Sequence, residues 1–102
     1  MFSESAELYD LIYAEFKDYA AEAEQVAEVV LRWRPEARSI LDLGCGTGRH
    51  AALLTESLGS AVDGLDINED FVDMAAARCP AGRFTKGDMS EFDLGRSYDV
   101  IL

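Results

Sequence analysis

The sequence predicts an α/β fold in which parallel strands alternate with helices. An apolar strand over residues 39–43 runs into a loop, residues 44–48, with glycine at every second position. After one helix a second apolar strand, residues 61–66, ends in Asp66. A glycine turn after one strand and an acid at the end of the next are typical of a βαβ unit that binds a nucleoside. Helical and short apolar segments continue to alternate up to residue 102, as such a sheet requires.

Two helices are predicted ahead of the first strand. The first, residues 3–18, carries apolar side chains near the helical period. The second, residues 19–33, has Val26, Val29, Val30 and Trp33 at i, i+3, i+4 and i+7, and Pro35 ends it. The chain therefore divides into an N-terminal helical segment, residues 1–38, and an α/β unit, residues 39–102.

Capping residues bound the two helices of the α/β unit. Thr47 is the expected N-cap of a helix over residues 48–58, and Gly59 closes it. Asn68 is the expected N-cap of a helix over residues 69–78.

Two shorter strands complete the pattern, over residues 83–86 and 98–102. The last segment, Tyr-Asp-Val-Ile-Leu, has the composition of a buried strand. Because natural domains rarely end within such a run, we expect the sequence to be the first part of a longer domain, truncated at this strand.

Composition and charge limit the classes of function. The 102 residues suffice for one domain, and 49% of them are hydrophobic. Nine basic residues against 20 acidic ones give a net charge of −11, which argues against a nucleic-acid partner. We find no membrane span or signal peptide, and two cysteines are too few for a disulfide framework, so we expect a cytoplasmic protein.

Two residues decide which nucleoside is expected. The dinucleotide pattern G-x-G-x-x-G requires a small residue where Arg49 stands. Asp42, at the mouth of the turn, would repel a pyrophosphate by roughly 1–4 kcal/mol. These residues disfavour an NAD-dependent reductase, whereas S-adenosylmethionine carries a sulfonium and an ammonium group that suit an acidic mouth.

The run D-L-G-C-G-T-G, the acidic end of the second strand and the later Gly87-Asp88-Met89 resemble the motifs of class I S-adenosylmethionine-dependent methyltransferases. The resemblance implies a Rossmann-like sheet, of which this chain holds the first half, with strand order 3-2-1-4 and helices on both faces.

The resemblance also implies roles for the loop residues. Gly44, Gly46 and Gly48 bring backbone against the cofactor, and the backbone at Gly44 and Cys45 holds its amino-acid end. Asp42 orients the loop or meets the ammonium group through water; the alternative is an ordinary carboxylate at a strand end.

The adenosine end is expected to meet residues that follow the second and third strands. Asp66 accepts both ribose hydroxyls, and Ile67 packs on one face of the adenine. Asp88 accepts a hydrogen bond from the adenine amine, or is a simple turn residue, and Met89 offers its backbone amide and apolar cover.

Two further polar residues are expected to have structural roles. Asp63 should face a helix end or solvent, and the single histidine, His50, should be a surface or packing residue rather than a general base. No metal site is expected, and no catalytic residue is identified.

The N-terminal segment carries a second resemblance. The patterns Y-D-x-I-Y, with Tyr9 and Tyr13, and K-D-Y, with Lys17 and Tyr19, are similar to small-molecule N-methyltransferases that dimethylate amino sugars on nucleotide carriers. In those enzymes an aromatic segment closes over the methionine and sulfonium, which tyrosine rings can stabilise. The alternative is an amphipathic helix with aromatic packing.

The sequence thus predicts transfer of a methyl group from S-adenosylmethionine to a small molecule, an amine, leaving S-adenosylhomocysteine. Catalysis would depend on proximity and alignment. The alternative is a nucleoside-binding module without catalysis, or an inert fragment of such an enzyme. Self-association through the unpaired edge of the fourth strand is also expected.

Overall fold

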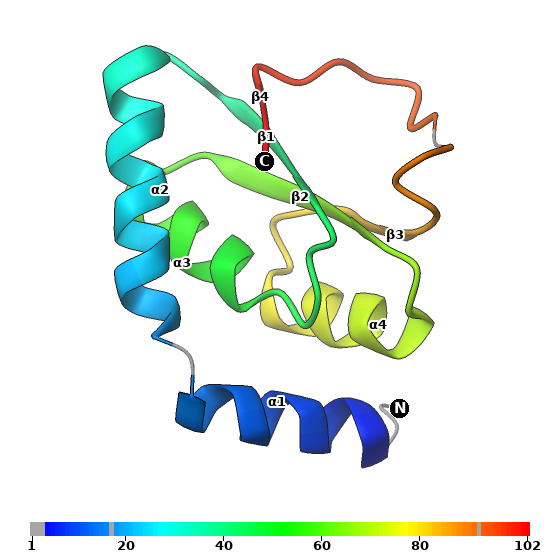
Figure 1. Cartoon of the computed structure of the whole chain (residues 1–102). Coiled ribbons are helices and arrows are strands. Elements are labelled where there is room, and N and C mark those ends of the chain that lie inside the picture. The colour runs from blue at the N-terminus through cyan, green and yellow to red at the C-terminus, as the bar shows by residue number, and fades with distance from the viewer. Residues whose placement is uncertain (1–3, 17, 92) are drawn as a thin grey trace.

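The computed structural model describes residues 4–16, 18–91 and 93–102, with the backbone alone for 13–16. None of the helices in this described part combines the length and apolar character needed to cross a bilayer. The elements in chain order are α1 (Glu4–Phe16), α2 (Tyr19–Trp33), β1 (Ser39–Leu43), α3 (Arg49–Leu58), β2 (Ala61–Asp66), α4 (Glu69–Arg78), β3 (Phe84–Lys86) and β4 (Val100–Ile101) (Figure 1).

The strands form one parallel sheet in the order β3-β2-β1-β4, which confirms the expected order. β1 pairs with β2 along its whole length, from Ser39 opposite Ala61 to Leu43 opposite Leu65. β4 pairs with β1 over two residues only. Because parallel strands share one direction, the loops that follow β1, β2 and β3 meet at the same edge of the sheet, and the site forms there.

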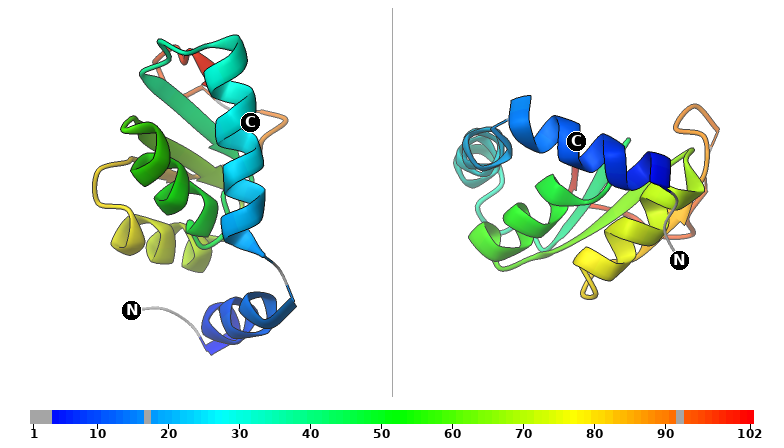
Figure 2. Two further views of the ribbon diagram at one scale, coloured as in Figure 1. Left: turned by 90° about the vertical axis from the view of Figure 1, so that its left-hand side faces the viewer. Right: turned by 90° about the horizontal axis from the view of Figure 1, so that it is seen from below.

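Three helices, α2, α3 and α4, cover one face of the sheet. The expectation of helices on both faces is therefore wrong for the described residues, which place no helix on the opposite face. The crossovers β1-α3-β2 and β2-α4-β3 proceed in the same direction across the sheet, so right-handed connections place α3 and α4 on the same face, side by side (Figure 2). α2 packs against α3 in the same layer. The buried core between them consists of Ala23, Ala27, Ile40, Ala51, Leu54, Val62 and Cys79.

Asp63 of β2 anchors the irregular connection from β3 to β4. The Asp63 carboxylate, 6% exposed, accepts hydrogen bonds from Arg83 N and Tyr98 Oη, both at 2.8 Å, and pairs with Arg96 at 3.0 Å. The expectation that Asp63 faces a helix end or solvent is therefore wrong, because its side chain is enclosed by Arg83 just before β3 and by Arg96 and Tyr98 ahead of β4.

Helix caps are confirmed at two positions and wrong at a third. Asn68 Oδ1 accepts from Phe71 N at 3.1 Å, and Gly59 closes α3 with φ +68°. α3, however, begins after Gly48, which makes no side-chain cap. Thr47 is not the N-cap, because its hydroxyl donates to Asp10 Oδ1 at 2.6 Å instead.

Candidate cofactor-binding site

The glycine loop, residues 44–48, turns the chain from β1 into α3 on left-handed backbone. Gly44, Gly46 and Gly48 have φ of +70°, +57° and +83°. The amides of Gly44 and Cys45 both donate to Leu65 O, at 2.7 and 3.0 Å, so the loop is fixed to the end of β2. A side chain at these φ values would be strained, which explains the repeated glycine.

Asp66, the last residue of β2, is fixed by two backbone amides. Its Oδ2 accepts from Gly46 N and its Oδ1 from Asn68 N, each at 2.9 Å. Each carboxylate oxygen can accept a further hydrogen bond. A Cβ on Gly46 would meet no atom within 4 Å, so the space beside this carboxylate is open. The arrangement can hold a diol on the carboxylate, close to bare backbone.

Asp66 lies in a pocket of about 210 Å³, here called the Asp66 pocket. It brings together residues that follow three different strands. The side chains of Ile67 and Met89 are 68% and 56% exposed, so two large apolar groups border a polar floor. The pocket is lined by Gly44, Leu65, Asp66, Ile67, Gly87, Asp88 and Met89, five of which are predicted site residues.

Asp88 is exposed at the rim of the Asp66 pocket. Its Oδ1 accepts from Ser90 N at 2.9 Å and from Ser90 Oγ at 2.7 Å, and these bonds lower the pKa of the carboxyl. Both roles expected for Asp88 are thus compatible with the geometry, since the turn contacts occupy Oδ1 and leave Oδ2 available as an acceptor.

A second, smaller pocket of about 60 Å³ lies over the glycine loop and is here called the loop pocket. Gly44 belongs to both pockets, so they adjoin. Tyr9 from α1 and Tyr19 from α2 line the loop pocket, whereas the Tyr13 side chain lies outside the described residues. The complete lining is Tyr9, Tyr19, Gly44, Cys45, Gly46, Thr47, Arg49 and His50.

Asp42 lies beside this pair of pockets rather than in either. It lines a third cavity of about 330 Å³, together with Glu22 and His50, and His50 is shared with the loop pocket. His50 Nε2 lies 2.9 Å from Glu22 Oε2, and the Tyr19 ring packs on the imidazole edge. Burial raises the pKa of Asp42 to about 6; His50 opposes the rise and Asp66 adds to it.

Two loop residues have packing roles in the structure. Burial, followed by the charges of Asp42 and Asp66, raises the pKa of Cys45 to about 12, so its thiol remains a neutral lining group. A Cβ on Gly48 would lie 2.8 Å from Ala75 Cα, so α4 packs directly against this glycine.

A buried carboxylate on α1 was missed by the sequence reasoning. Asp10 is 5% exposed and accepts hydrogen bonds from Thr47, Arg49 and Arg78 at 2.6–3.0 Å. The one local signal is its position four residues after Ala6, which is also buried, on the same face of α1. An acid on a buried helix face requires cationic partners, but the sequence does not say which of them.

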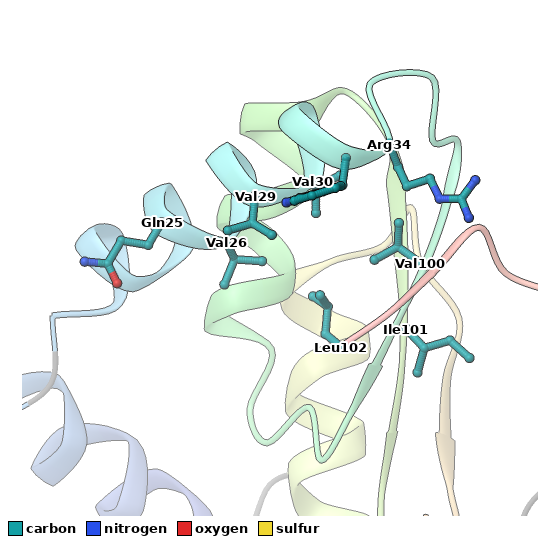
Figure 3. A pocket seen from close by; sticks show the side chains of 9 residues that line it. Gln25, Val26, Val29, Val30, Arg34, Val100, Ile101 and Leu102 are labelled. Carbon is teal, nitrogen blue, oxygen red and sulfur yellow. The ribbon is translucent and has the colours of Figure 1, made fainter.

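The described residues also form an apolar groove of about 390 Å³ between α2 and β4, here called the α2–β4 groove (Figure 3). It contains none of the predicted site residues and lies away from the glycine loop. Its lining is Gln25, Val26, Val29, Val30, Trp33, Arg34, Val100, Ile101 and Leu102.

Residues 40–102 match the family model described as a methyltransferase domain. The chain is 42% identical over 98 residues to the dTDP-3-amino-3,4,6-trideoxy-alpha-D-glucopyranose N,N-dimethyltransferase of Streptomyces venezuelae, covering 95% of this chain and 41% of that protein. It thus spans about two fifths of the length of this curated relative.

Solved structures agree with the sequence match. The crystal structure of Streptomyces venezuelae DesVI superposes with a TM-score of 0.84 at 40% identity, covering 99% of this chain and 43% of that one. CalS10 is described as an amino pentose methyltransferase from Micromonospora echinaspora with bound S-adenosylmethionine. It gives a TM-score of 0.83 at 35% identity, covering 92% of this chain and 40% of that one. The chain belongs to the class I S-adenosylmethionine-dependent methyltransferases.

Proposed function

We propose that this chain is the cofactor-binding part of an N-methyltransferase that acts on a small amine, an amino sugar carried on a nucleotide. The observation that carries the proposal is the pair of adjoining pockets at Gly44. The Asp66 pocket has a fixed carboxylate between exposed apolar side chains, and the loop pocket has the backbone of the glycine loop beneath tyrosine side chains. S-adenosylmethionine has a matching division into an adenosine and an amino-acid end.

The Asp66 pocket would hold the adenosine. The Asp66 carboxylate takes the ribose hydroxyls, while Ile67 and Met89 cover the adenine and Asp88 accepts from its amine. The fit rests on Asp66, because the amides of Gly46 and Asn68 hold its two oxygens in place before any ligand arrives.

The loop pocket would hold the amino-acid end. Backbone at Gly44, Cys45 and Gly46 lines it, and Tyr9 provides an aromatic wall. Asp42, one cavity away, supplies negative charge to the ammonium group through water. We assign Gly48 to the packing of α4 rather than to the cofactor, which refines the role expected for it.

The cofactor supplies a methyl group on a positively charged sulfur, which the amine of the acceptor displaces in line. The task of this chain is to orient that methyl group and to exclude water with the N-terminal segment, residues 1–38. The amino-sugar acceptor is supported by the names of the relatives, which describe N,N-dimethyltransferases of dTDP-linked amino sugars.

Calorimetric titration with S-adenosylhomocysteine tests the proposal. We expect micromolar binding by the wild-type chain and none for NADH. Asp66→Ala should weaken binding by at least about tenfold, because a hydrogen bond to a charged group contributes about 1.5–3 kcal/mol. Asp66→Asn keeps an acceptor for the Gly46 amide, and should show whether the carboxylate itself binds the ligand.

Asp73→Ala is the matched control, since Asp73 is an exposed acid on α4. It should bind as the wild type does. Equal affinity of the wild type and Asp66→Ala would contradict the proposed site, and tight NADH binding would contradict the proposed cofactor.

A further inference from the structure

The described side chains of α1, residues 4–12, bury little apolar surface against the rest of the molecule. Among its described side chains, only Ala6 and Asp10 are buried, at 1% and 5% exposed. Leu8, Leu11 and Ile12 are 58%, 67% and 45% exposed. Figures 1 and 2 show α1 as a rod beside α4, apart from the sheet. Hydrophobic burial by residues 4–12 therefore contributes little to the position of this helix.

The Asp10 carboxylate provides a polar attachment of α1. Oδ1 accepts from Thr47 Oγ1 at 2.6 Å and from Arg49 Nε at 2.7 Å. Oδ2 accepts from Arg49 Nη2 at 3.0 Å and from Arg78 Nη2 at 2.7 Å. One side chain thus joins α1 to the glycine loop, to the start of α3 and to the end of α4. The Arg49 contact is bidentate, the geometry that fixes orientation as well as distance.

The environment keeps this carboxylate ionised. Burial alone would raise the pKa of Asp10, but hydrogen bonds from Arg49, Arg78 and Thr47 outweigh burial and lower it well below the usual range. Arg78 also donates to Thr47 O at 2.8 Å, so the partners of Asp10 are connected to one another. Removing the charge would leave two guanidinium groups without their common partner.

The neighbouring residue connects this network to the proposed cofactor. Tyr9 lines the loop pocket together with Thr47 and Arg49, and its ring packs on Phe71 with centroids 4.6 Å apart. Because Asp10 is adjacent to Tyr9 on the helix, the bonds that hold the Asp10 carboxylate also hold the backbone from which the Tyr9 ring extends.

We propose that Asp10 is a positioning residue, which docks α1 over the loop pocket and thereby sets the affinity for the amino-acid end of the cofactor. The proposal rests on the cofactor arrangement described under the proposed function. Asp10 touches neither proposed ligand end; it acts through Thr47, Arg49 and Tyr9.

A pair of ligands separates positioning from general stability. S-adenosylhomocysteine carries both ends, whereas 5′-methylthioadenosine has the adenosine and sulfur without the amino-acid chain. Asp10→Asn preserves shape and removes the charge. We expect this variant to lower the affinity for S-adenosylhomocysteine by about tenfold or more. The affinity for 5′-methylthioadenosine should fall by less than about twofold in calorimetric titrations of the full chain. Glu7→Gln, which removes an exposed acid from α1, should change neither.

Hydrogen exchange read by mass spectrometry supplies a second measurement that needs no ligand. In Asp10→Asn the amides of α1 should exchange at least about tenfold faster, while those of β1 and β2 keep their wild-type rates. Unchanged protection of α1 would overturn the proposal, as would equal losses of affinity for both ligands. Failure of the wild-type chain to bind S-adenosylhomocysteine would instead overturn the proposed function, and the exchange result would still decide whether Asp10 docks α1.

Discussion

Asp10, which is buried, and Asp42, which is half-buried, have opposite effects on this fold because their neighbours differ. Asp10 has two arginines and a hydroxyl as partners, which hold its pKa low. Asp42 is also largely enclosed, but its nearest charges are His50 and another acid, Asp66, and its pKa rises to about 6. A carboxylate thus stabilises the chain at one position and destabilises it at the other.

The raised pKa of Asp42 predicts a pH-dependent cost. The folded protein binds this proton more tightly than the unfolded chain, so the free energy of unfolding falls as pH rises from about 4 through about 6. The difference from the ordinary value of 3.8 corresponds to about 3 kcal/mol. Partial exposure reduces the expected effect to about 1–2 kcal/mol.

Asp42→Asn should therefore raise the free energy of unfolding by about 1–2 kcal/mol at pH 8 and by about half as much at pH 5. Urea unfolding of the two proteins across this range measures it. Asp73→Asn, at an exposed position on α4, is the control and should give no such trend. A gain at Asp42 that is independent of pH would show that the pKa is not raised by burial.

At this scale the sequence predicts residues whose contacts are local. The position of Asp66 at the end of β2 is predicted by the apolar run before it, and the cap at Asn68 by a bond to an amide three residues on. Asp10 was not found, because its partners Thr47 and Arg78 are 37 and 68 residues away. Such pairings depend on the fold as a whole.

The contact between α3 and α4 illustrates how elements constrain single residues. The third glycine of the loop, Gly48, is expected to offer its backbone to a ligand, and Ala75 of α4 lies where a Gly48 side chain would be. The closing residue of α3, Gly59, has a similar φ of +68° but nothing within 4 Å of a Cβ. A side chain at either glycine would be strained by the positive φ, but only a side chain at Gly48 would also collide with a neighbouring helix. Comparing substitutions at the two positions therefore separates the cost of backbone strain from the cost of helix packing.

Gly59→Ala should cost only the strain of a left-handed alanine, about 1–2 kcal/mol. Gly48→Ala should cost about 2–4 kcal/mol, because the contact with backbone at Ala75 adds an overpacking term. Urea unfolding at neutral pH compares the two variants. Equal losses would mean that α4 can move away from the loop at no cost.

Most element bounds could be predicted from local patterns. Periodicity and caps placed α2, β1, β2 and α4 as the structure has them, and the remaining elements within about two residues. The N-cap of α3 was wrong because Asp10, a distant residue, takes the Thr47 hydroxyl. The connection after β3 could not be predicted, since Arg96 and Tyr98 are held by Asp63, which lies more than 30 residues earlier in the sequence.

At the scale of the whole molecule, the α2–β4 groove and the edge of β4 form an apolar surface on a highly acidic protein. Val29, Trp33 and Ile101 are 56%, 74% and 57% exposed. In the described residues β4 pairs on one side only, with β1. An unpaired apolar edge favours association, while the net charge of −11 opposes it.

We therefore expect reversible self-association through β4 that strengthens with salt, because screening weakens the repulsion between acidic copies more than the apolar contact. Light scattering after size exclusion should give a mass that rises with protein concentration, and more steeply at about 0.5 M NaCl than at low salt. Ile101→Lys should restore a monomer, since charge on a strand edge blocks pairing. Leu8→Lys is the matched control: Leu8 is 58% exposed, against 57% for Ile101, and lies on α1, outside the groove. The Leu8→Lys variant should associate as the wild type does. A monomeric mass of the wild-type chain at every protein and salt concentration would contradict pairing through the edge of β4.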